Sequence, residues 1–403
     1  MSDFHQGGAI TTLHRLGQPN VDRLERDLET SAWARPIALV LPCLYAELDT
    51  PALSRIVQEL RQVRYLREIV VSLGRAKPDE FQKAKRFFAE LPQPLRIIWN
   101  DGPRIQALYR ELEESALVIG PDGKGRSAWM AYGYVLAHDQ SEVIALHDCD
   151  IITYDRELLV RLCYPVANPR LDFEFCKGYY NRVTDRLHGR VTRLFITPLT
   201  RALQKILGPL PFLVFLDSFK YPLAGEFAMI ADLARVNRIP GDWGLEVGVL
   251  AEMYRNCAAT RICQSDLGDA YEHKHQPLNA KQPRRGLMRM AVDIAKQIFR
   301  TLGEEGAVIS ESLLTSLTTT YLRTAREFTS RYQNDAMINS LIFDQHQEGT
   351  AVESFAHALQ IASREYLANP LGTLLIPNWN RVVSAIPGFF DRLRTAVELD
   401  NKP

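Results

Sequence analysis

Short apolar runs alternate with segments of helical periodicity up to about residue 265. Apolar residues recur at helical spacing in three segments, 51–63, 78–91 and 104–115. Each of these segments follows a short run of the kind found in buried strands: 36–41 (PIALVL), 68–72 (EIVVS) and 95–99 (LRIIW). Successive strand–helix units form parallel sheets through right-handed crossovers. The pattern therefore predicts an α/β fold with a Rossmann-like, mostly parallel sheet flanked by helices.

From about residue 284 the pattern is helical only. Ser312–Tyr332 and Val352–Leu367, for example, have apolar residues at helical spacing and contain no chemical motif. We therefore expect two regions, 1–283 with the α/β fold and 284–403 as a helical C-terminal extension. Dimerisation is one role open to the extension.

Composition and charge narrow the class of protein. The chain has 403 residues, of which 46% are hydrophobic and 24% charged, as is ordinary for a globular protein. Its 48 Lys and Arg residues balance 48 Asp and Glu residues, so no overall basic field indicates nucleic-acid binding. No apolar signal core opens the chain, and no apolar run approaches the roughly 20 residues of a spanning helix. We expect neither nucleic-acid nor membrane partners.

The cysteines favour a reducing compartment. None of them lies in C-x-x-C spacing, which argues against both a zinc ribbon and a disulfide framework. We therefore expect a cytoplasmic protein. The six cysteines are Cys43, Cys149, Cys163, Cys176, Cys257 and Cys263.

The first chemical signal is an acidic pair at the end of an apolar run. In Glu142–Ile152 (EVIALHDCDII) the run ends in Asp148 and Asp150, spaced two apart. In an extended segment this spacing puts both carboxylates on one face, at the edge where an α/β sheet presents its ligands. Carboxylate oxygens suit Mg²⁺ or Mn²⁺, which can also hold a phosphate. The pair predicts a metal-bridged nucleotide or sugar nucleotide; the alternative is a solvated strand end.

A glycine-rich loop precedes this acidic run. Gly120–Ser127 (GPDGKGRS) lies directly before a helical segment, 128–137. A Walker A loop needs Ser or Thr after Gly-Lys, whereas Gly125 follows Lys124, so an ATPase P-loop is not expected. Glycine still allows close backbone approach, and a helix N-terminus and a lysine both favour anions. The loop predicts a phosphate contact by Lys124; the alternative is a flexible surface turn.

These motifs, with four later segments in the same order, resemble the bacterial glucosyl-3-phosphoglycerate synthases, which are retaining glycosyltransferases with a GT-A fold. The match runs from about Ile10 to Leu278. The later segments are His188–Thr192 (HGRVT), Pro222–Ala228 (PLAGEFA), Gly241–Leu250 (GDWGLEVGVL) and Leu267–Leu278 (LGDAYEHKHQPL).

The resemblance implies an activity and an organisation. The activity is metal-dependent transfer of glucose from a nucleoside-diphosphate glucose, usually UDP-glucose, to the 2-hydroxyl of 3-phospho-D-glycerate. The product feeds synthesis of glucosylglycerate, a compatible solute. A nucleotide-sugar half would cover about 30–152 and an acceptor half about 153–283, and the protein would be a homodimer.

For the donor, the resemblance implies contacts from eight positions. Glu47 could equally be a charge at a helix start, and the family's Asp-Ser-Gly-Ser is altered here around Ser72. Glu246 would accept hydrogen bonds from glucose hydroxyls. Glu226 belongs to the same pocket or caps the following helix, and Trp243 is expected in the core. The eight implied donor contacts are Pro42, Leu44, Glu47, Ser72, Lys124, Asp148, Gly225 and Glu246.

For the metal, the resemblance implies Asp150 and a histidine of a later loop as ligands of Mg²⁺ or Mn²⁺. His273 and His275 alternate in HKH, so either could be the metal ligand. Their spacing in the sequence from Pro277 and Leu278 favours His273. His147 is expected to be structural.

For the acceptor, Gly189, Arg190, Val191 and Thr192 match the family's phosphoglycerate motif. A free glycine backbone, a guanidinium and a hydroxyl at a helix start suit a small dianion; the alternative is an ordinary helix opening with a solvated arginine. His275 replaces a family asparagine that helps hold the acceptor, and Tyr271 stands where an arginine is usual.

The implied catalytic group is Asp150, Lys124 and Glu246, which would position the donor and stabilise charge. No general base is named, because front-face displacement needs none. A related transferase using GDP-glucose, GDP-mannose or glycerate stays open, as does a non-catalytic GT-A scaffold acting through its helical tail. A nucleotide hydrolase is disfavoured because no water-activating motif is present.

Overall fold

The computed structural model describes residues 6–268, 271–272, 278, 285–372 and 374–402, and its centre is an eight-stranded sheet. The strand order is β1-β8-β6-β7-β5-β2-β3-β4, and every neighbouring pair is parallel except those made by β7. The strands are β1 Thr11–Leu13, β2 Ile37–Leu44, β3 Leu66–Gly74, β4 Leu95–Trp99, β5 Val143–Leu146, β6 Phe175–Tyr179, β7 Phe227–Ile230 and β8 Ile262–Asp266. The predicted α/β class with a mostly parallel sheet is confirmed.

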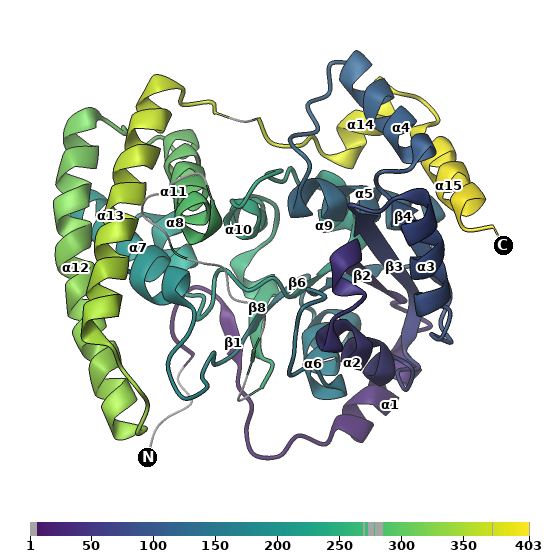
Figure 1. The fold of residues 1–403 in the computed structure, drawn as a ribbon, viewed down its shortest axis with the longest axis horizontal. Helices are drawn as coiled ribbons and strands as arrows, with labels where there is room; N and C mark the ends of the chain where they lie inside the picture. Colours follow the sequence, from purple (N-terminus) through teal and green to yellow (C-terminus); the bar gives the residue numbers. More distant parts are fainter. Residues whose placement is uncertain (1–5, 269–270, 273–277, 279–284, 373, 403) are drawn as a thin grey trace.

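Helices pack on both faces of the sheet (Figure 1). Alternation along β2 explains why, since Ala38 and Val40 enter one hydrophobic cluster and Leu39 and Leu41 the other. The helices are α1 Val21–Ser31, α2 Pro51–Leu60, α3 Pro78–Phe88, α4 Pro103–Glu114, α5 Lys124–His138, α6 Arg156–Ala167, α7 Thr197–Leu207, α8 Pro211–Asp217, α9 Ala231–Val236, α10 Leu245–Asn256, α11 Gly286–Glu304, α12 Glu311–Ile338, α13 Gln345–Ala368, α14 Trp379–Ala385 and α15 Phe389–Asp400. In the part of the chain that the structure describes, none of these helices is long and apolar enough to cross a bilayer.

Two local boundaries differ from those expected. Helix α5 begins at Lys124, so the Gly-Lys-Gly loop forms its first turn instead of preceding it. Strand β5 ends at Leu146, so Asp148 and Asp150 lie in the loop after the strand and not in an extended segment. Their proximity therefore depends on the path of that loop and not on strand alternation.

The C-terminal extension is helical, as predicted, and it packs at two separate places. Helices α11, α12 and α13 lie against α7 and a π-helical turn, Val191–Ile196, whereas α14 and α15 pack beside α4 and α5 at the other end of the molecule (Figure 1). Residues of both groups join the same hydrophobic cluster as α5. The extension therefore contributes to the main core, and the boundary at 283/284 stays a prediction.

Trp379 attaches α14 to this core. Its ring stacks on Trp129 of α5 with centroids 4.0 Å apart, and a Cβ on Gly133 would lie 2.1 Å from the Trp379 ring. The absence of a side chain at Gly133 is thus what lets the indole pack against α5.

We expect Trp379→Ala to lower the free energy of unfolding by about 3–5 kcal/mol, because it leaves a cavity against Trp129. Denaturant unfolding followed by circular dichroism measures this. The matched control is Trp33→Ala, since Trp33 is 82% exposed; its effect should stay within about 0.5 kcal/mol. Equal effects of the two substitutions would contradict the packing described.

Candidate functional site

A lysine and two carboxylates meet at the edge of the sheet where β2, β5 and β6 end. Lys124 Nζ lies 2.6 Å from Asp148 Oδ1 and 3.2 Å from Glu246 Oε1. Lys124 begins α5, Asp148 follows β5, and Glu246 lies in the first turn of α10. Three predicted donor contacts from distant parts of the chain are thus brought together, and in this structure they are bonded to one another.

The antiparallel direction of β7 brings Gly225 into the same place. Phe227 at the start of β7 pairs with Leu146 at the end of β5, so the segment before β7 meets the segment after β5. A Cβ on Gly225 would lie 2.6 Å from Asp148 Oδ2 and 2.8 Å from Lys124 Nζ. Any side chain at this position would therefore disturb the Lys124–Asp148 ion pair.

Burial and the mutual repulsion of the carboxylates change their ionisation. Burial, then Asp148 and Glu47, raises the pKa of Asp150 to about 7. Burial also raises the pKa of Glu47. Burial opposes the charge of Lys124, but Asp148 and Glu246 more than offset it and raise the pKa of Lys124. Because burial and the neighbouring carboxylates favour the protonated form of Asp150, a hard divalent cation would compensate the charge of its ionised oxygen. The predicted metal partner His273 lies outside the described residues, as does His275.

His147 is buried behind this acidic loop. Its Nδ1 lies 2.9 Å from the carbonyl oxygen of Asp148, and burial lowers the pKa of His147 to about 4. A neutral imidazole that donates to the Asp148 carbonyl would hold the loop in place. This position agrees with the structural role expected for His147.

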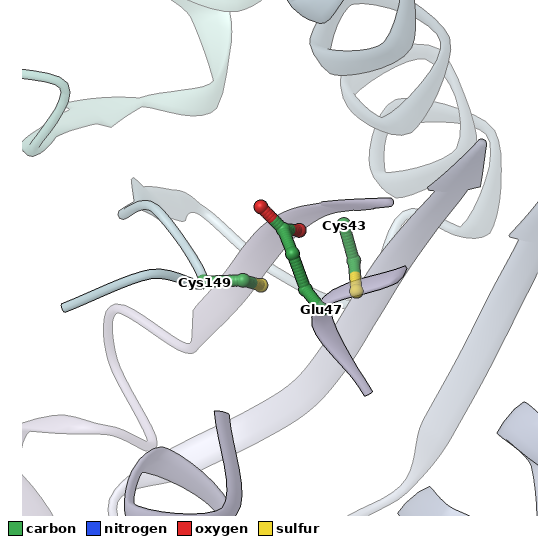
Figure 2. Close-up of side chains that lie close together, drawn as sticks. All are labelled: Cys43, Glu47 and Cys149. Atoms are coloured by element: carbon green, nitrogen blue, oxygen red, sulfur yellow. The ribbon is translucent and has the colours of Figure 1, made fainter. Parts of the chain in front are cut away.

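Beside the acidic loop, Cys43, Glu47 and Cys149 converge from the end of β2, the turn after it and the loop after β5 (Figure 2). Their potential ligand atoms lie within 4.8 Å of one another. Two sulfurs and one carboxylate suit a soft ion and not Mg²⁺ or Mn²⁺. The bond to Cys43 and burial raise the pKa of the Cys149 thiol, which favours its protonated form. The cluster is therefore not the site expected for the hard cation.

Glu47 has a local structural partner. Its Oε2 accepts a hydrogen bond from the backbone N–H of Leu44 at 2.7 Å and so closes the 3₁₀ turn Tyr45–Glu47. This geometry agrees with the alternative stated for Glu47, a carboxylate at the start of a helical turn. Pro42 is half-buried and Leu44 is 41% exposed, so the end of β2 is accessible to a ligand. Donor contacts from these three residues stay predictions.

Ser72 is fully buried and its hydroxyl is engaged on several sides. Ser72 Oγ donates to the carbonyl of Ser127 at 2.9 Å and accepts from Asn100 Nδ2 at 2.9 Å, and Ser127 Oγ lies 2.7 Å away. The serine thus links β3 to the first turn of α5, which carries Lys124. The structure gives Ser72 a supporting position, and the direct nucleotide contact stays a prediction.

Trp243 differs from the expectation stated for it, and one of the two alternatives stated for Glu226 is wrong. The expectation that Trp243 lies in the core is wrong, because it is 44% exposed in the surface turn that Asp242 closes before α10. Glu226 is fully buried and does not cap the following helix. Instead its carboxylate accepts hydrogen bonds from Tyr180 at 2.8 Å and Tyr271 at 2.5 Å.

Sequence reasoning gave no role to this tyrosine pair or to Lys177. The Tyr180 and Tyr271 rings stack with centroids 3.6 Å apart, which fixes both hydroxyls on Glu226. Lys177 of β6 is fully buried, and its Nζ has no hydrogen-bond partner among the residues described. Burial lowers its pKa to about 8, and Glu246 and Glu226 are the nearest opposing charges. The sequence signal that could have singled out Lys177 is a lysine inside an otherwise apolar, buried strand.

The predicted acceptor motif opens a π-helical turn. Gly189 has φ +71°, a conformation that favours glycine, and Val191–Ile196 is the turn itself. Thr192 is buried, and within the described chain its Oγ1 has no hydrogen-bond partner. Arg190 is not the solvated arginine of the alternative, because its Nε lies 3.2 Å from Glu348 Oε1 and it also contacts Gln347. Within the described chain, the motif thus combines the Thr192 hydroxyl, which has no hydrogen-bond partner, with the Arg190 guanidinium, which Glu348 and Gln347 hold in place.

A cavity of about 410 Å³ adjoins this motif. Both Thr192 and Tyr180 line it, and Tyr180 also bonds Glu226. Cationic groups outnumber the two carboxylates of its wall, Asp217 and Asp335. The cavity therefore suits a small anion close to the Lys124 cluster. Its cationic lining residues are Arg182, Arg193, Arg201 and Lys220.

This fold, with an acidic loop after β5, is that of a GT-A glycosyltransferase, and solved structures of that class resemble it. Glucosyl-3-phosphoglycerate synthase from Mycobacterium tuberculosis, in complex with Mn²⁺, UDP-glucose and phosphoglyceric acid, superimposes with a TM-score of 0.52, 21% identity and coverage of 73% of this chain and 88% of that chain. Mannosyl-3-phosphoglycerate synthase from Rubrobacter xylanophilus gives 0.54, with 20% identity and coverage of 74% and 83%. At this identity the likeness shows the fold alone.

Sequence comparison goes further and shows the family. Glucosyl-3-phosphoglycerate synthase from Persephonella marina is 50% identical over 401 residues, which cover 100% of this chain and 99% of that protein. The protein of the same name from Methanococcoides burtonii is 38% identical over 405 residues, covering 99% and 98%. The chain belongs to the glucosyl-3-phosphoglycerate synthase family. No family model matches it.

We expect Gly225→Ala to lower kcat at least about tenfold, because displacing Lys124 or Asp148 by an ångström spoils the alignment of the site. Steady-state kinetics on the folded variant measures this. Gly349→Ala is the matched control, since a Cβ there meets nothing within 4 Å, and its activity should equal that of the unchanged protein. Full activity of Gly225→Ala would contradict the close approach.

The pKa of Asp150 predicts a pH-dependent effect on stability. Asp150 titrates at about 7 in the folded protein, against about 4 when unfolded. Between these values the folded state binds more protons, so this group lowers stability as pH rises. In metal-free buffer, the Tm of Asp150→Asn should exceed that of the unchanged protein by an amount that grows from pH 4 to about 7 and then levels off. A difference that does not change with pH would refute the assignment.

Proposed function

We propose that the protein transfers glucose from UDP-glucose to the 2-hydroxyl of 3-phospho-D-glycerate, with retention of configuration and with bound Mg²⁺ or Mn²⁺. The observation that carries the proposal is the meeting of two sites of opposite charge. An acidic site around Asp148 and Asp150 and a cationic cavity beside Gly189–Thr192 share the Tyr180–Glu226 hydrogen bond. Full-length relatives named for this reaction support it.

Asp150 and His273 are the residues proposed to hold the cation. When bound, the cation would neutralise charge on the diphosphate leaving group. The fit rests on the donor set, because Asp150 is a carboxylate whose pKa is raised to about 7 by burial and by the neighbouring carboxylates Asp148 and Glu47. The solved M. tuberculosis relative in complex with Mn²⁺ and UDP-glucose supports this choice of ion and donor.

Lys124 would move from one set of anions to another on donor binding. In this structure its Nζ bonds to Asp148 and Glu246. A diphosphate can replace these carboxylates as the partner of Lys124, which frees Asp148 for the ribose and Glu246 for the glucose hydroxyls. This exchange keeps the ammonium paired throughout, and an unpaired buried charge is costly.

In the reaction, the bond from the glucose anomeric carbon to the diphosphate oxygen breaks while a bond to the acceptor 2-oxygen forms on the same face. The acceptor hydroxyl passes its proton to an oxygen of the departing diphosphate, so no side chain is needed as base. Glu226 is the buried carboxylate between the two sites, and both its oxygens accept tyrosine hydrogen bonds. This arrangement fits a fixed negative charge and not a nucleophile.

For the acceptor, the motif offers a backbone turn, a guanidinium and an unused hydroxyl. We assign the phosphate or carboxylate of 3-phosphoglycerate to Gly189, Arg190, Val191 and Thr192, with His275 as a further contact. The cationic wall of the cavity favours a phosphorylated acceptor over glycerate. A homodimer is part of the proposal and is testable by sedimentation.

The test is product formation by purified protein with Mn²⁺ or Mg²⁺. UDP-glucose, GDP-glucose and GDP-mannose are each offered with 3-phosphoglycerate and with glycerate. We expect product from UDP-glucose and 3-phosphoglycerate, none after EDTA treatment, and a loss of at least about a thousandfold in Asp150→Ala. The control is Asp232→Ala, whose side chain is 87% exposed and which should keep full activity.

If product forms with another donor or acceptor instead, that compound is the substrate, and the choice of UDP-glucose or 3-phosphoglycerate is wrong. Absence of product from every pair with folded protein would contradict the activity. UDP binding by calorimetry would then separate a transferase with a different acceptor from a non-catalytic scaffold, which has no reason to bind UDP.

A further inference from the structure

Glu348, in the first turn of α13, bonds to Arg190 of the proposed acceptor motif and to Arg193, which directly follows the motif. Its Oε1 lies 3.2 Å from Arg190 Nε and its Oε2 lies 2.8 Å from Arg193 Nη1. The residue is only 5% exposed. A single buried carboxylate from the C-terminal extension therefore fixes the two guanidinium groups that flank Val191 and Thr192.

Arg193 carries this constraint into the turn itself. Its Nε donates to the carbonyl of His188 at 2.7 Å and its Nη2 to the carbonyl of Leu187 at 3.2 Å. These carbonyls belong to the two residues before Gly189. The chain of contacts from Glu348 through Arg193 thus reaches the backbone of the turn that presents the motif.

The rest of the α12–α13 hairpin adds to the same wall. Ile342, between the two helices, donates its N–H to the carbonyl of Asp185 at 2.8 Å. Tyr332 of α12 lies under the Arg193 guanidinium, with its ring centroid 4.9 Å away, and lines the cavity together with Asp335. Figure 1 shows α12 and α13 running side by side along this flank. The hairpin is therefore one wall of the anion cavity.

The geometry leaves part of Arg190 available to a ligand. A guanidinium has five N–H groups in a planar fork. Within the described chain, Glu348 and Gln347 engage the Nε and Nη2 atoms of Arg190. The Nη1 group is not used in these bonds, and the Arg190 side chain is 30% exposed. Because the Glu348 carboxylate holds the Nε edge of the guanidinium, it also fixes the direction in which Nη1 of Arg190 points.

We propose that Glu348 is a positioning residue for the acceptor, which makes the C-terminal hairpin a working part of the acceptor site. This inference rests on the proposed function, since it needs Gly189–Thr192 to bind the phosphorylated acceptor. Glu348 acts through Arg190 and Arg193 and does not itself touch the acceptor.

The first test is Glu348→Gln, assayed against 3-phosphoglycerate with UDP-glucose saturating. Gln offers one accepting oxygen, so it can serve only one of the two arginines. We expect the KM for 3-phosphoglycerate to rise about tenfold, with the KM for UDP-glucose and kcat within about twofold. An unchanged KM would overturn the proposal. So would a lower KM, which is the result if Glu348 only opposes the acceptor's negative charge.

A double-mutant cycle distinguishes positioning from a general effect on folding. In an Arg190→Ala background, Glu348→Gln should raise the KM for 3-phosphoglycerate by about threefold or less, because the route through Arg190 is lost and only the route through Arg193 remains. Effects that multiply independently would overturn the proposal. Glu353→Gln is the matched control, since Glu353 is an exposed glutamate of the same helix, and its kinetics should not change. If Glu348→Gln fails to fold, Glu348→Asp replaces it, with a smaller rise in the same KM.

The same set of variants separates this inference from the function on which it rests. If Arg190→Ala leaves the KM for 3-phosphoglycerate unchanged, the motif is not the acceptor site. If Arg190→Ala raises that KM and Glu348→Gln does not, the acceptor site stands and the role of Glu348 is refuted.

Discussion

The site depends on the ion pairs of Lys124, which join three elements that are distant in the sequence. Its ammonium bonds to Asp148 in the loop after β5 and to Glu246 at the start of α10. This contact is possible only because backbone comes unusually close at two glycines. A Cβ would lie 2.1 Å from the Pro240 carbonyl oxygen at Gly125 and 2.6 Å from Asp148 Oδ2 at Gly225. Packing around Lys124 is thus the constraint that brings the loop after β5, the segment before β7 and the start of α10 to one point.

The same constraint creates an electrostatic imbalance. Of the four carboxylates gathered there, Glu226 is fully buried, whereas Asp148, Asp150 and Glu47 are partly buried. Burial raises the pKa of Asp150, Glu47 and Glu226. Such a cluster lowers stability unless protons or cations compensate it. A protein that gains only structure from these residues would be better served by apolar ones. In the function proposed for this protein, a bound cation would compensate the imbalance.

The C-terminal extension links the two ends of the molecule. Trp379 stacks on Trp129 of α5, the helix that begins with Lys124, while Glu348 bonds to Arg190 and Arg193 in and beside the proposed acceptor motif. Both groups of helices share the main hydrophobic cluster. The extension therefore packs against α5 on the side proposed for the donor and, through α13, against the motif proposed for the acceptor.

Local pattern determined much of this protein by itself. Strand 95–99 matches β4, the other two predicted strands lie within β2 and β3 apart from Pro36, and the predicted helices correspond to α2, α3 and α4, because alternation and helical spacing report which face of a segment is buried. Lys124, Asp148 and Gly189–Thr192 could be singled out because their motifs are short and contiguous. Only the tertiary structure decided that Ser72 supports α5, that Glu226 is held by Tyr180 and Tyr271, and that Glu348 holds Arg190. The partners of a buried polar group come from distant segments, so its role is defined by packing and leaves no periodic signal in the chain.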